Sequence, residues 1–325
     1  MDQENVRGTL PGPDFKDRRA GLIVFGILAI FIGCICALFV PLMFLGQALS
    51  ARTTGEPQDY RMVLPGAMSY AVMGVGFVWL GIGSIMARRW ARALLLVLAW
   101  MWLLLGIFTI GIVAAFLPGM IAASAPDAQS MPAAVAMVIT LFVLAFTAVV
   151  LVIVPGAFIL FYRSRHVKAT CEARDPMPRW TDACPLPVLA LSLALAFTPL
   201  SLVTMLVGFN SVVPFFGHLL TGAPATALLV LLTAVWTYGA WATYKLKPLG
   251  WWVVTAAVVV FSASAVLTFA RVDLIDVYQA MGYPTRDVRL MRGVALVHGQ
   301  TFTVMVAVIL APFIGYLFWM KRYFR

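Results

Sequence analysis

The sequence has almost no charge where its apolar residues are concentrated. All 23 basic and 13 acidic residues lie between the long apolar segments. The chain is 62% hydrophobic and only 11% charged, whereas roughly a quarter of the residues of ordinary soluble domains are charged. Ionisable groups inside a membrane mark proton relays and ion paths. Their absence argues against proton- or ion-coupled transport through the apolar segments.

The sequence also lacks the motifs by which many enzymes and metalloproteins are recognised. It contains no phosphate-binding Gly-rich loop, no His-Glu-x-x-His zinc helix and no Gly-x-Ser-x-Gly nucleophile elbow. Only 4 cysteines and 3 histidines are present. These absences disfavour an enzyme, leave catalytic and cofactor-binding residues unassigned, and predict no cofactor.

What the chain does have is a series of long uncharged stretches, each able to cross a bilayer, for which about 20 helical residues suffice. They are residues 20–51, 62–87, 93–126, 128–162, 185–244, 248–270 and 293–320. As one helix the fifth stretch would be roughly 90 Å long, so it must fold back at the glycines and prolines between Gly208 and Pro224. The sequence therefore predicts an all-α integral membrane protein with about eight transmembrane helices.

The basic residues are distributed unequally between the loops. Most of the 23 lie in the N-terminal tail, in every second loop and at the C-terminus. The positive-inside rule then predicts that both termini are cytoplasmic, and we expect a multi-pass protein of a bacterial-type cytoplasmic membrane. The net charge of +10 follows from this bias. Lipid headgroups are the expected partners of these residues, and no nucleic-acid partner is predicted.

Eight spans divide the chain into two halves of four. The expected organisation is a flexible cytoplasmic tail, a first four-helix half, a cytoplasmic connecting loop, a second four-helix half and a basic C-terminal tail, at residues 1–19, 20–162, 163–184, 185–320 and 321–325. In both halves basic residues precede Trp at the start of the third span, which hints at a parallel 4+4 repeat. The general preference of basic residues and Trp for inner span ends explains this pattern without any repeat.

Small residues recur at a regular spacing in the second span. Gly74 and Gly81 are seven residues apart, as are Gly76 and Gly83. In lipid, where apolar burial alone does not drive association, small residues let helix backbones approach closely. The spacing predicts close packing within the protein's own bundle, and a homodimer seam is the alternative.

The connecting loop at residues 163–184 has the composition of an ordered segment. Its second half combines two prolines with an interfacial Trp and helix-capping residues. We expect a folded cap that docks the two halves, or a surface that binds a partner, with contact residues Asp175, Arg179, Trp180 and Asp182.

Cys171 and Cys184 lie in the same loop. Their separation differs from the paired spacing typical of zinc sites, and a cytoplasmic position disfavours a disulfide. We interpret both as free structural thiols, with a metal site and a disulfide as the less favoured alternatives.

Two loops on the opposite side contain further candidates. His218 and His298 are predicted at the same membrane face, where they are candidate metal ligands, although lone histidines at helix ends are more often interfacial polar residues. The loop at residues 271–292 predicts a short amphipathic helix that ends at Gly282 and Pro284. Its candidate contact residues are Asp273, Asp276 and Arg286. A lid, a substrate vestibule and a subunit contact are all compatible with this loop.

Three functional hypotheses follow. The first is an accessory or scaffold subunit that acts through helix packing and loop contacts, in the lipid bilayer and with a protein partner or a second copy of the chain. The second is a permease for an apolar or lipid-like substrate, which needs no charge inside the membrane. The third is a membrane enzyme with an extracytoplasmic site.

Overall fold

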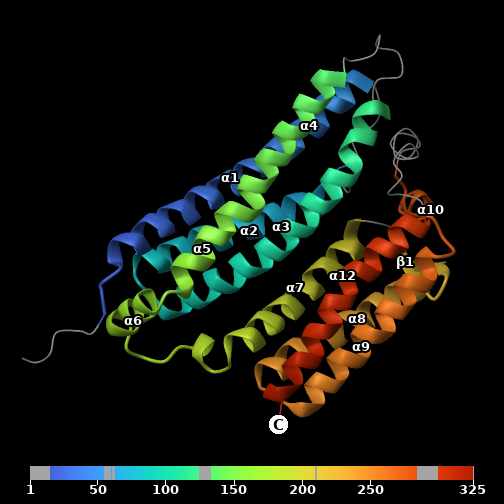
Figure 1. The fold of residues 1–325 in the computed structure, drawn as a ribbon. Helices are drawn as coiled ribbons and strands as arrows, with labels where there is room; N and C mark the ends of the chain where they lie inside the picture. The colour runs from blue at the N-terminus through green and yellow to red at the C-terminus, as the bar shows by residue number, and fades with distance from the viewer. Residues whose placement is uncertain are drawn as a thin grey trace, which may run out of the picture.

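The computed structural model describes residues 15–54, 60, 63–123, 133–208, 211–283 and 299–324. Within these residues, 8 helical spans are long and apolar enough to cross a membrane. This confirms the prediction of a helical, multi-pass membrane protein, and the even number of spans places the first and last helix ends at the same side of the molecule (Figure 1).

The first half forms a bundle of four spans. They are α1 (Arg19–Thr54), α2 (Leu64–Ile85), α3 (Arg89–Ala123) and a fourth span built from α4 (Ala133–Ala148), a π-helical turn (Val149–Ile153) and α5 (Val154–Arg163). The π turn arises because Pro155 has no N–H to donate to the Leu151 carbonyl four residues earlier. Gly106 of α3 lies against this carbonyl, where any larger residue would collide with backbone.

The second half forms a separate bundle of four spans, drawn from yellow to red in Figure 1. They are α7 (Leu186–Gly208), α8 (Gly222–Tyr244), α9 (Pro248–Phe269) and α12 (Gly299–Met320), and a 3₁₀ turn, η4 (Lys321–Tyr323), follows α12. Between the halves lie a short helix, α6 (Arg165–Arg174), and a 3₁₀ turn, η2 (Trp180–Asp182). We call the end of the molecule that carries α6 and η2 the cap end.

The opposite end carries a β-hairpin, β1 (Val213–Phe215) and β2 (His218–Leu220), so the fold is not purely helical as predicted. Gly217 takes a left-handed conformation with φ +87° in the turn. The hairpin docks on α9, because the N–H groups of Phe216 and Gly217 donate to the hydroxyls of Ser264 and Thr268, each at 2.9 Å. We call this end the hairpin end; it also carries α10 (Leu274–Ala280), which confirms the predicted short helix after α9.

Helices α1 and α2 are joined by a seam of glycines. Gly26 faces Gly81, and Gly33 faces Gly74, so that each pair brings backbone against backbone. A Cβ added at Gly81 would lie 2.6 Å from the carbonyl oxygen of Gly26. The predicted role of Gly74 and Gly81 in close packing within the bundle is therefore confirmed, with partners on α1.

The two bundles meet mainly at the cap end. Ala93, near the start of α3, belongs to the same buried cluster as Leu189 and Leu195 of α7. Further along, Leu104 of α3 is 63% exposed and Val203 of α7 is 42% exposed. The two helices accordingly lie close at the cap end and diverge towards the hairpin end (Figure 1).

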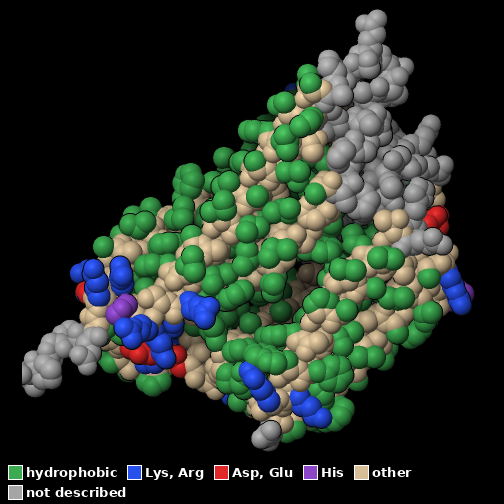
Figure 2. Space-filling model, viewed as in Figure 1, with side chains coloured by type: hydrophobic (Ala, Val, Ile, Leu, Met, Phe, Trp, Pro, Cys, Tyr) green, Lys and Arg blue, Asp and Glu red, His purple; other side chains and the backbone are tan. Residues whose placement is uncertain are grey.

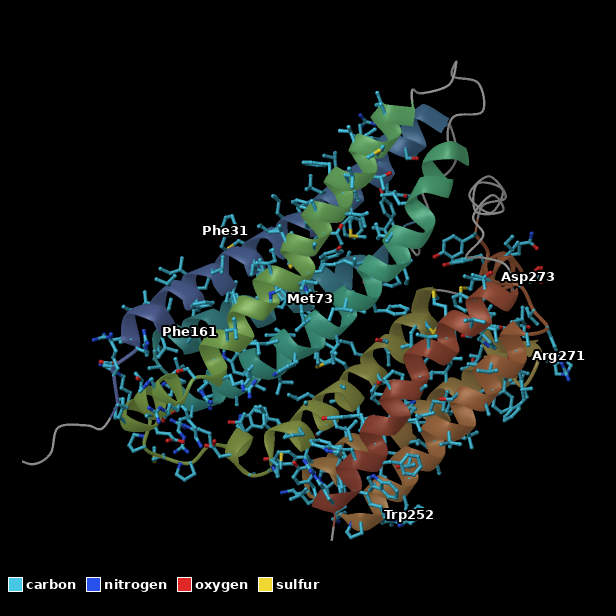
Figure 3. The ribbon with its side chains drawn as sticks, viewed as in Figure 1. Phe31, Met73, Phe161, Trp252, Arg271 and Asp273 are labelled. Carbon is cyan, nitrogen blue, oxygen red and sulfur yellow. The ribbon has the colours of Figure 1, made fainter. Side chains whose placement is uncertain are left out.

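The faces between the two ends are covered with apolar side chains, while Lys and Arg gather at the cap end (Figure 2). Phe31 on α1 and Trp252 on α9 are 60% and 59% exposed and point away from the bundles (Figure 3). A surface this apolar fits the lipid environment that the span lengths require.

Candidate functional site

The cap end is organised around one carboxylate, Asp175, which is 2% exposed. Arg179 donates to both of its oxygens, with Nη2 2.7 Å from Oδ1 and Nε 3.1 Å from Oδ2. Arg88 Nη1 lies 3.7 Å from Oδ1, and the backbone N–H of Arg89 donates to Oδ2 at 3.3 Å. The bound Arg179 guanidinium holds the pKa of Asp175 below its ordinary value, although burial acts in the opposite direction.

Further contacts join this cap to both bundles. The Arg89 side chain, which begins α3, pairs with Glu172 of α6 at 3.6 Å and with Asp182 of η2 at 3.3 Å. On the other side, the hydroxyl of Tyr244 at the end of α8 donates to the Trp180 carbonyl at 2.9 Å. The structure thus brings Asp175, Arg179, Trp180 and Asp182 together between the halves.

The described part of the N-terminal tail, predicted to be flexible, is bonded to α6. Asp17 forms an ion pair with Arg174 at 3.1 Å, and the N–H of Arg18 donates to the Thr170 hydroxyl at 3.1 Å. Because Arg174 donates to it, the pKa of Asp17 is lowered from its ordinary value. All four acidic residues of this region, Asp17, Glu172, Asp175 and Asp182, are therefore engaged within the chain.

Cys171 and Cys184 are buried and free, with no disulfide between them. Burial raises the pKa of the Cys171 thiol to about 11 and also raises that of Cys184. Both are thiols at neutral pH, whereas zinc binds thiolates. Among the described residues no group of three or more His, Cys, Asp or Glu side chains could hold a metal ion.

The structure describes only some of the candidate residues at the hairpin end. His218 is exposed at the start of β2, in register with Phe215. Asp273 and Asp276 lie at the start of α10, and Figure 3 places Asp273 near Arg271 at this end. His298 and Arg286 lie outside the described residues, so a metal site shared by the two histidines stays a prediction.

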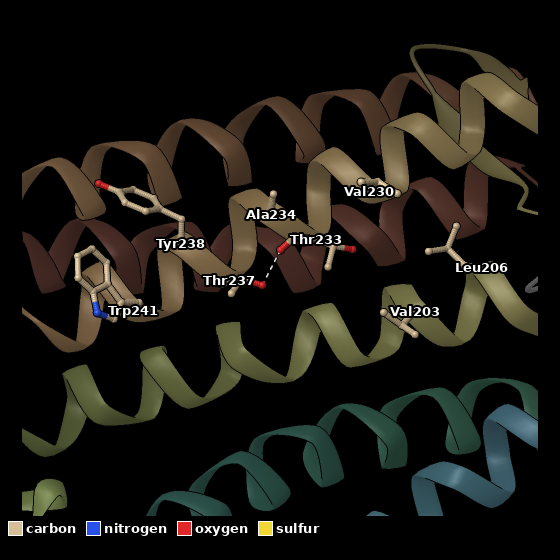
Figure 4. A pocket seen from close by; sticks show the side chains of 8 residues that line it. All are labelled: Val203, Leu206, Val230, Thr233, Ala234, Thr237, Tyr238 and Trp241. Atoms are coloured by element: carbon tan, nitrogen blue, oxygen red, sulfur yellow. Dashed lines mark hydrogen bonds between the residues drawn. The ribbon is translucent and has the colours of Figure 1, made fainter.

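A groove between α7 and α8 is the strongest candidate site in the described part of the chain. It has a volume of about 700 Å³ and is open on one side. Figure 4 shows its lining side chains, which are Val203 and Leu206 from α7 and Val230, Thr233, Ala234, Thr237, Tyr238 and Trp241 from α8. Apolar carbon dominates the wall, which suits a hydrocarbon ligand.

The two threonine hydroxyls of the groove are bonded to carbonyls of their own helix. Thr233 donates to the Leu229 carbonyl and Thr237 donates to the Thr233 carbonyl, both at 2.7 Å. At the cap end of the groove, the Lys247 ammonium lies 4.0 Å from the centre of the Trp241 ring. The groove therefore has an apolar trough with one cation at its end.

The sequence alone does not reveal this groove. The α8 residues that line it recur at spacings of three and four, which is the pattern of one helix face. In a span that is apolar all round, however, such a face cannot be told from the others. The contribution of Val203 and Leu206 from α7 depends on how the two helices pack.

Comparisons of the chain with protein families, with curated proteins and with solved structures found no match. The acidic residues of the cap are neutralised by arginines of the same chain, which gives the cap a structural role. The open groove is the better candidate for binding another molecule.

Proposed function

We propose that the protein is a carrier for apolar, lipid-like molecules, with the α7–α8 groove as their binding site. The groove itself is the main support, because its wall is apolar, its two threonine hydroxyls bond to their own helix and it is open to the outside of the molecule. A molecule dissolved in the bilayer could enter such a groove without passing through water. A carrier of this kind needs no charge within its spans, in agreement with the composition.

The arrangement of the two halves supports the same proposal. At the cap end the connecting loop is bonded to α3 through Arg89 and to α8 through Tyr244, and the facing helices of the two halves diverge towards the hairpin end. Two bundles joined at one end can rock against each other, which is the usual way in which transporter halves expose a site alternately. The paired cap would then act as the hinge.

Reconstituted vesicles containing a fluorescent phospholipid test this function. We expect the protein to move label from the inner to the outer leaflet, where dithionite quenches it, faster than in protein-free vesicles. The Ala234→Trp variant fills the groove with an indole and should slow this movement several-fold.

Ala227→Trp is the matched control, because it introduces the same residue on the same helix beyond the groove. It should leave the rate unchanged. Wild-type protein that moves label no faster than empty vesicles would overturn the proposed function. Equal rates of lipid movement for the two tryptophan variants would show that the groove is not the binding site of the carrier.

We also propose an orientation for the protein in the membrane. The cap end and both termini lie on the cytoplasmic side of a bacterial-type cytoplasmic membrane. The positive-inside bias supports it. Met177, 65% exposed in the cap, and Thr221, exposed at the hairpin end, provide the test. A membrane-impermeant maleimide should label Met177→Cys only in inverted vesicles and Thr221→Cys only in right-side-out vesicles, after subtraction of the wild-type signal. The reverse pattern would refute this orientation.

A parallel repeat of the two halves is supported by one local likeness. Ala87 after α2 and Leu246 after α8 have φ angles of 54° and 55°, and in both turns the next N–H bonds back at 2.9 Å. A pair of small residues packs across each turn at the same offset along the chain, Gly83 with Ala91 and Ala242 with Gly250. Such a duplication would suit a two-halved carrier.

No observation on the described residues supports the other two hypotheses. An accessory or scaffold subunit, with a protein partner or a second copy of the chain, stays a prediction that mass spectrometry of the complex purified in mild detergent would test. A membrane enzyme also stays a prediction, because its candidate His298 lies outside the described residues.

A further inference from the structure

We infer that the groove takes one acyl chain of an anionic glycerophospholipid, whose phosphate lies at Lys247. This inference rests on the proposed function and narrows it, because it names the charge of the headgroup and the direction in which the lipid lies. The acyl chain would run along α8 from Trp241 towards Val230.

The length of the groove fits one acyl chain. From Val230 to Trp241 the helix rises about 17 Å, at about 1.5 Å per residue. One leaflet of a bilayer has a hydrocarbon depth of about 15 Å, half of the usual thickness of about 30 Å. The groove therefore matches a single chain in the leaflet at the cap end.

The threonines inside the groove do not need a polar ligand. Its two threonine hydroxyls donate to backbone carbonyls of α8, which removes their need for another partner. Tyr238 and Trp241, at the cap end of the groove, are partly exposed, as aromatic residues at a membrane interface usually are. Along the groove, the apolar wall is followed by the aromatic residues and then by the cation. A lipid has the same order of parts, from acyl chain to glycerol to phosphate.

The charge at the end of the groove is not neutralised within the described part of the chain. Lys245 and Lys247 are exposed, and no ion pair joins either of them to a carboxylate among the described residues. Arg89, by contrast, pairs with two carboxylates of the cap. Figure 2 shows basic side chains without acidic neighbours at the bottom of the view, where the second bundle ends. A phosphate would complement Lys247, which lies over the lining residue Trp241.

We expect the site to bind an anionic lipid better than a zwitterionic one, because of the charge of the headgroup. Both have a phosphate, but the zwitterionic headgroup adds an ammonium close to Lys247, and like charges repel. A site near the membrane surface is partly screened by salt, so the preference should weaken as ionic strength rises.

Lys321 provides a matched control for Lys247. Its ammonium also lies over indole rings, 5.2 Å from the centres of both Trp251 and Trp252, at the same end of the molecule. Neither of these rings lines the groove. Lys247→Gln and Lys321→Gln therefore remove the same charge and the same kind of cation–π contact, and only the first changes the groove.

The test is native mass spectrometry of the full chain, purified in detergent and mixed with phosphatidylglycerol or phosphatidylcholine of identical acyl chains. We expect wild-type protein to retain phosphatidylglycerol several-fold better. Lys247→Gln should lose this preference, whereas Lys321→Gln should keep it. Ala234→Trp, which fills the groove, should lower retention of both lipids. Thermal unfolding of each variant checks that it has folded.

Each outcome bears on a separate step. Equal loss in the two lysine variants would show unspecific attraction at the cap end and would overturn the inference, as would equal retention of the two lipids by wild-type protein. Unchanged retention in Ala234→Trp would overturn the placement of the acyl chain. Failure of lipid movement in vesicles would instead refute the carrier function, even if phosphatidylglycerol is bound as expected.

Discussion

Gly81→Leu should be the most damaging single substitution in the α1–α2 seam. A Cβ at this position would lie 2.6 Å from the Gly26 carbonyl oxygen, 2.7 Å from Ile30 Cγ1 and 3.0 Å from the Ile30 nitrogen. Two of these atoms belong to the backbone of α1, so they cannot turn aside as a flexible side chain would. Overpacking of this kind costs about 1–3 kcal/mol and sometimes more. We expect a large fall in the thermal unfolding temperature measured in detergent.

Gly76→Leu is the control for this prediction. It makes the same substitution on the same helix, but a Cβ at Gly76 meets nothing within 4 Å. The control should unfold at nearly the wild-type temperature. Similar unfolding temperatures for Gly81→Leu and wild-type protein would mean that α1 and α2 do not pack through these glycines.

The seam also bears on the homodimer alternative for Gly74 and Gly81. Gly74 and Gly81 face Gly33 and Gly26 of the same chain, so these four residues are occupied within the bundle. They are consequently not free to form a homodimer seam. An oligomer of this protein would have to use another surface.

Much of the fold could be predicted from the sequence because lipid imposes simple requirements. Uncharged stretches long enough to cross a bilayer must be helices, since every backbone polar group needs a partner within the membrane. The recurrence of Gly74 and Gly81 likewise indicates a close contact. Which helix they contact depends on the fold, because Gly26 and Gly33 are two of many small residues in α1.

Features that depend on contacts between distant segments could not be predicted. The hairpin at β1 and β2 is held by Ser264 and Thr268 of α9, whose sequence neighbours suggest only an apolar span. The groove needs both α7 and α8, and its cation, Lys247, comes from the start of α9. The cap was easier to predict, since prolines and capping residues order a loop locally.

Asp175→Asn should weaken the cap more than any other neutralisation of a cap carboxylate. The side chain keeps its size but loses its charge, so the contacts from Arg179 and Arg88 lose their anion. Hydrogen bonds to a charged group contribute about 1.5–3 kcal/mol, and an Asp that is 2% exposed receives little compensation from water. We expect a lower unfolding temperature at neutral pH.

The control is Glu172→Gln, which makes the equivalent change at a carboxylate whose side chain is 40% exposed. Its ion pairs with Arg89 and Lys168 are 3.6 and 3.8 Å long. Exposed pairs of this kind contribute under about 1 kcal/mol. The control should therefore lose little stability, and an equal loss in the two variants would contradict the central place of Asp175 in the cap.

The pH dependence of unfolding gives this prediction a second measurement. The pKa of Asp175 is lowered in the folded protein, chiefly because Arg179 donates to the carboxylate. A group with a lowered folded-state pKa stabilises the fold above its unfolded pKa, ordinarily 3.8 for Asp, and this stabilisation is lost as the pH falls through the folded value. The difference in unfolding temperature between wild-type protein and Asp175→Asn should thus be constant from neutral pH to about pH 5 and shrink below pH 4. A difference that persists undiminished in acid would mean that the charge of Asp175 is not what holds the cap together.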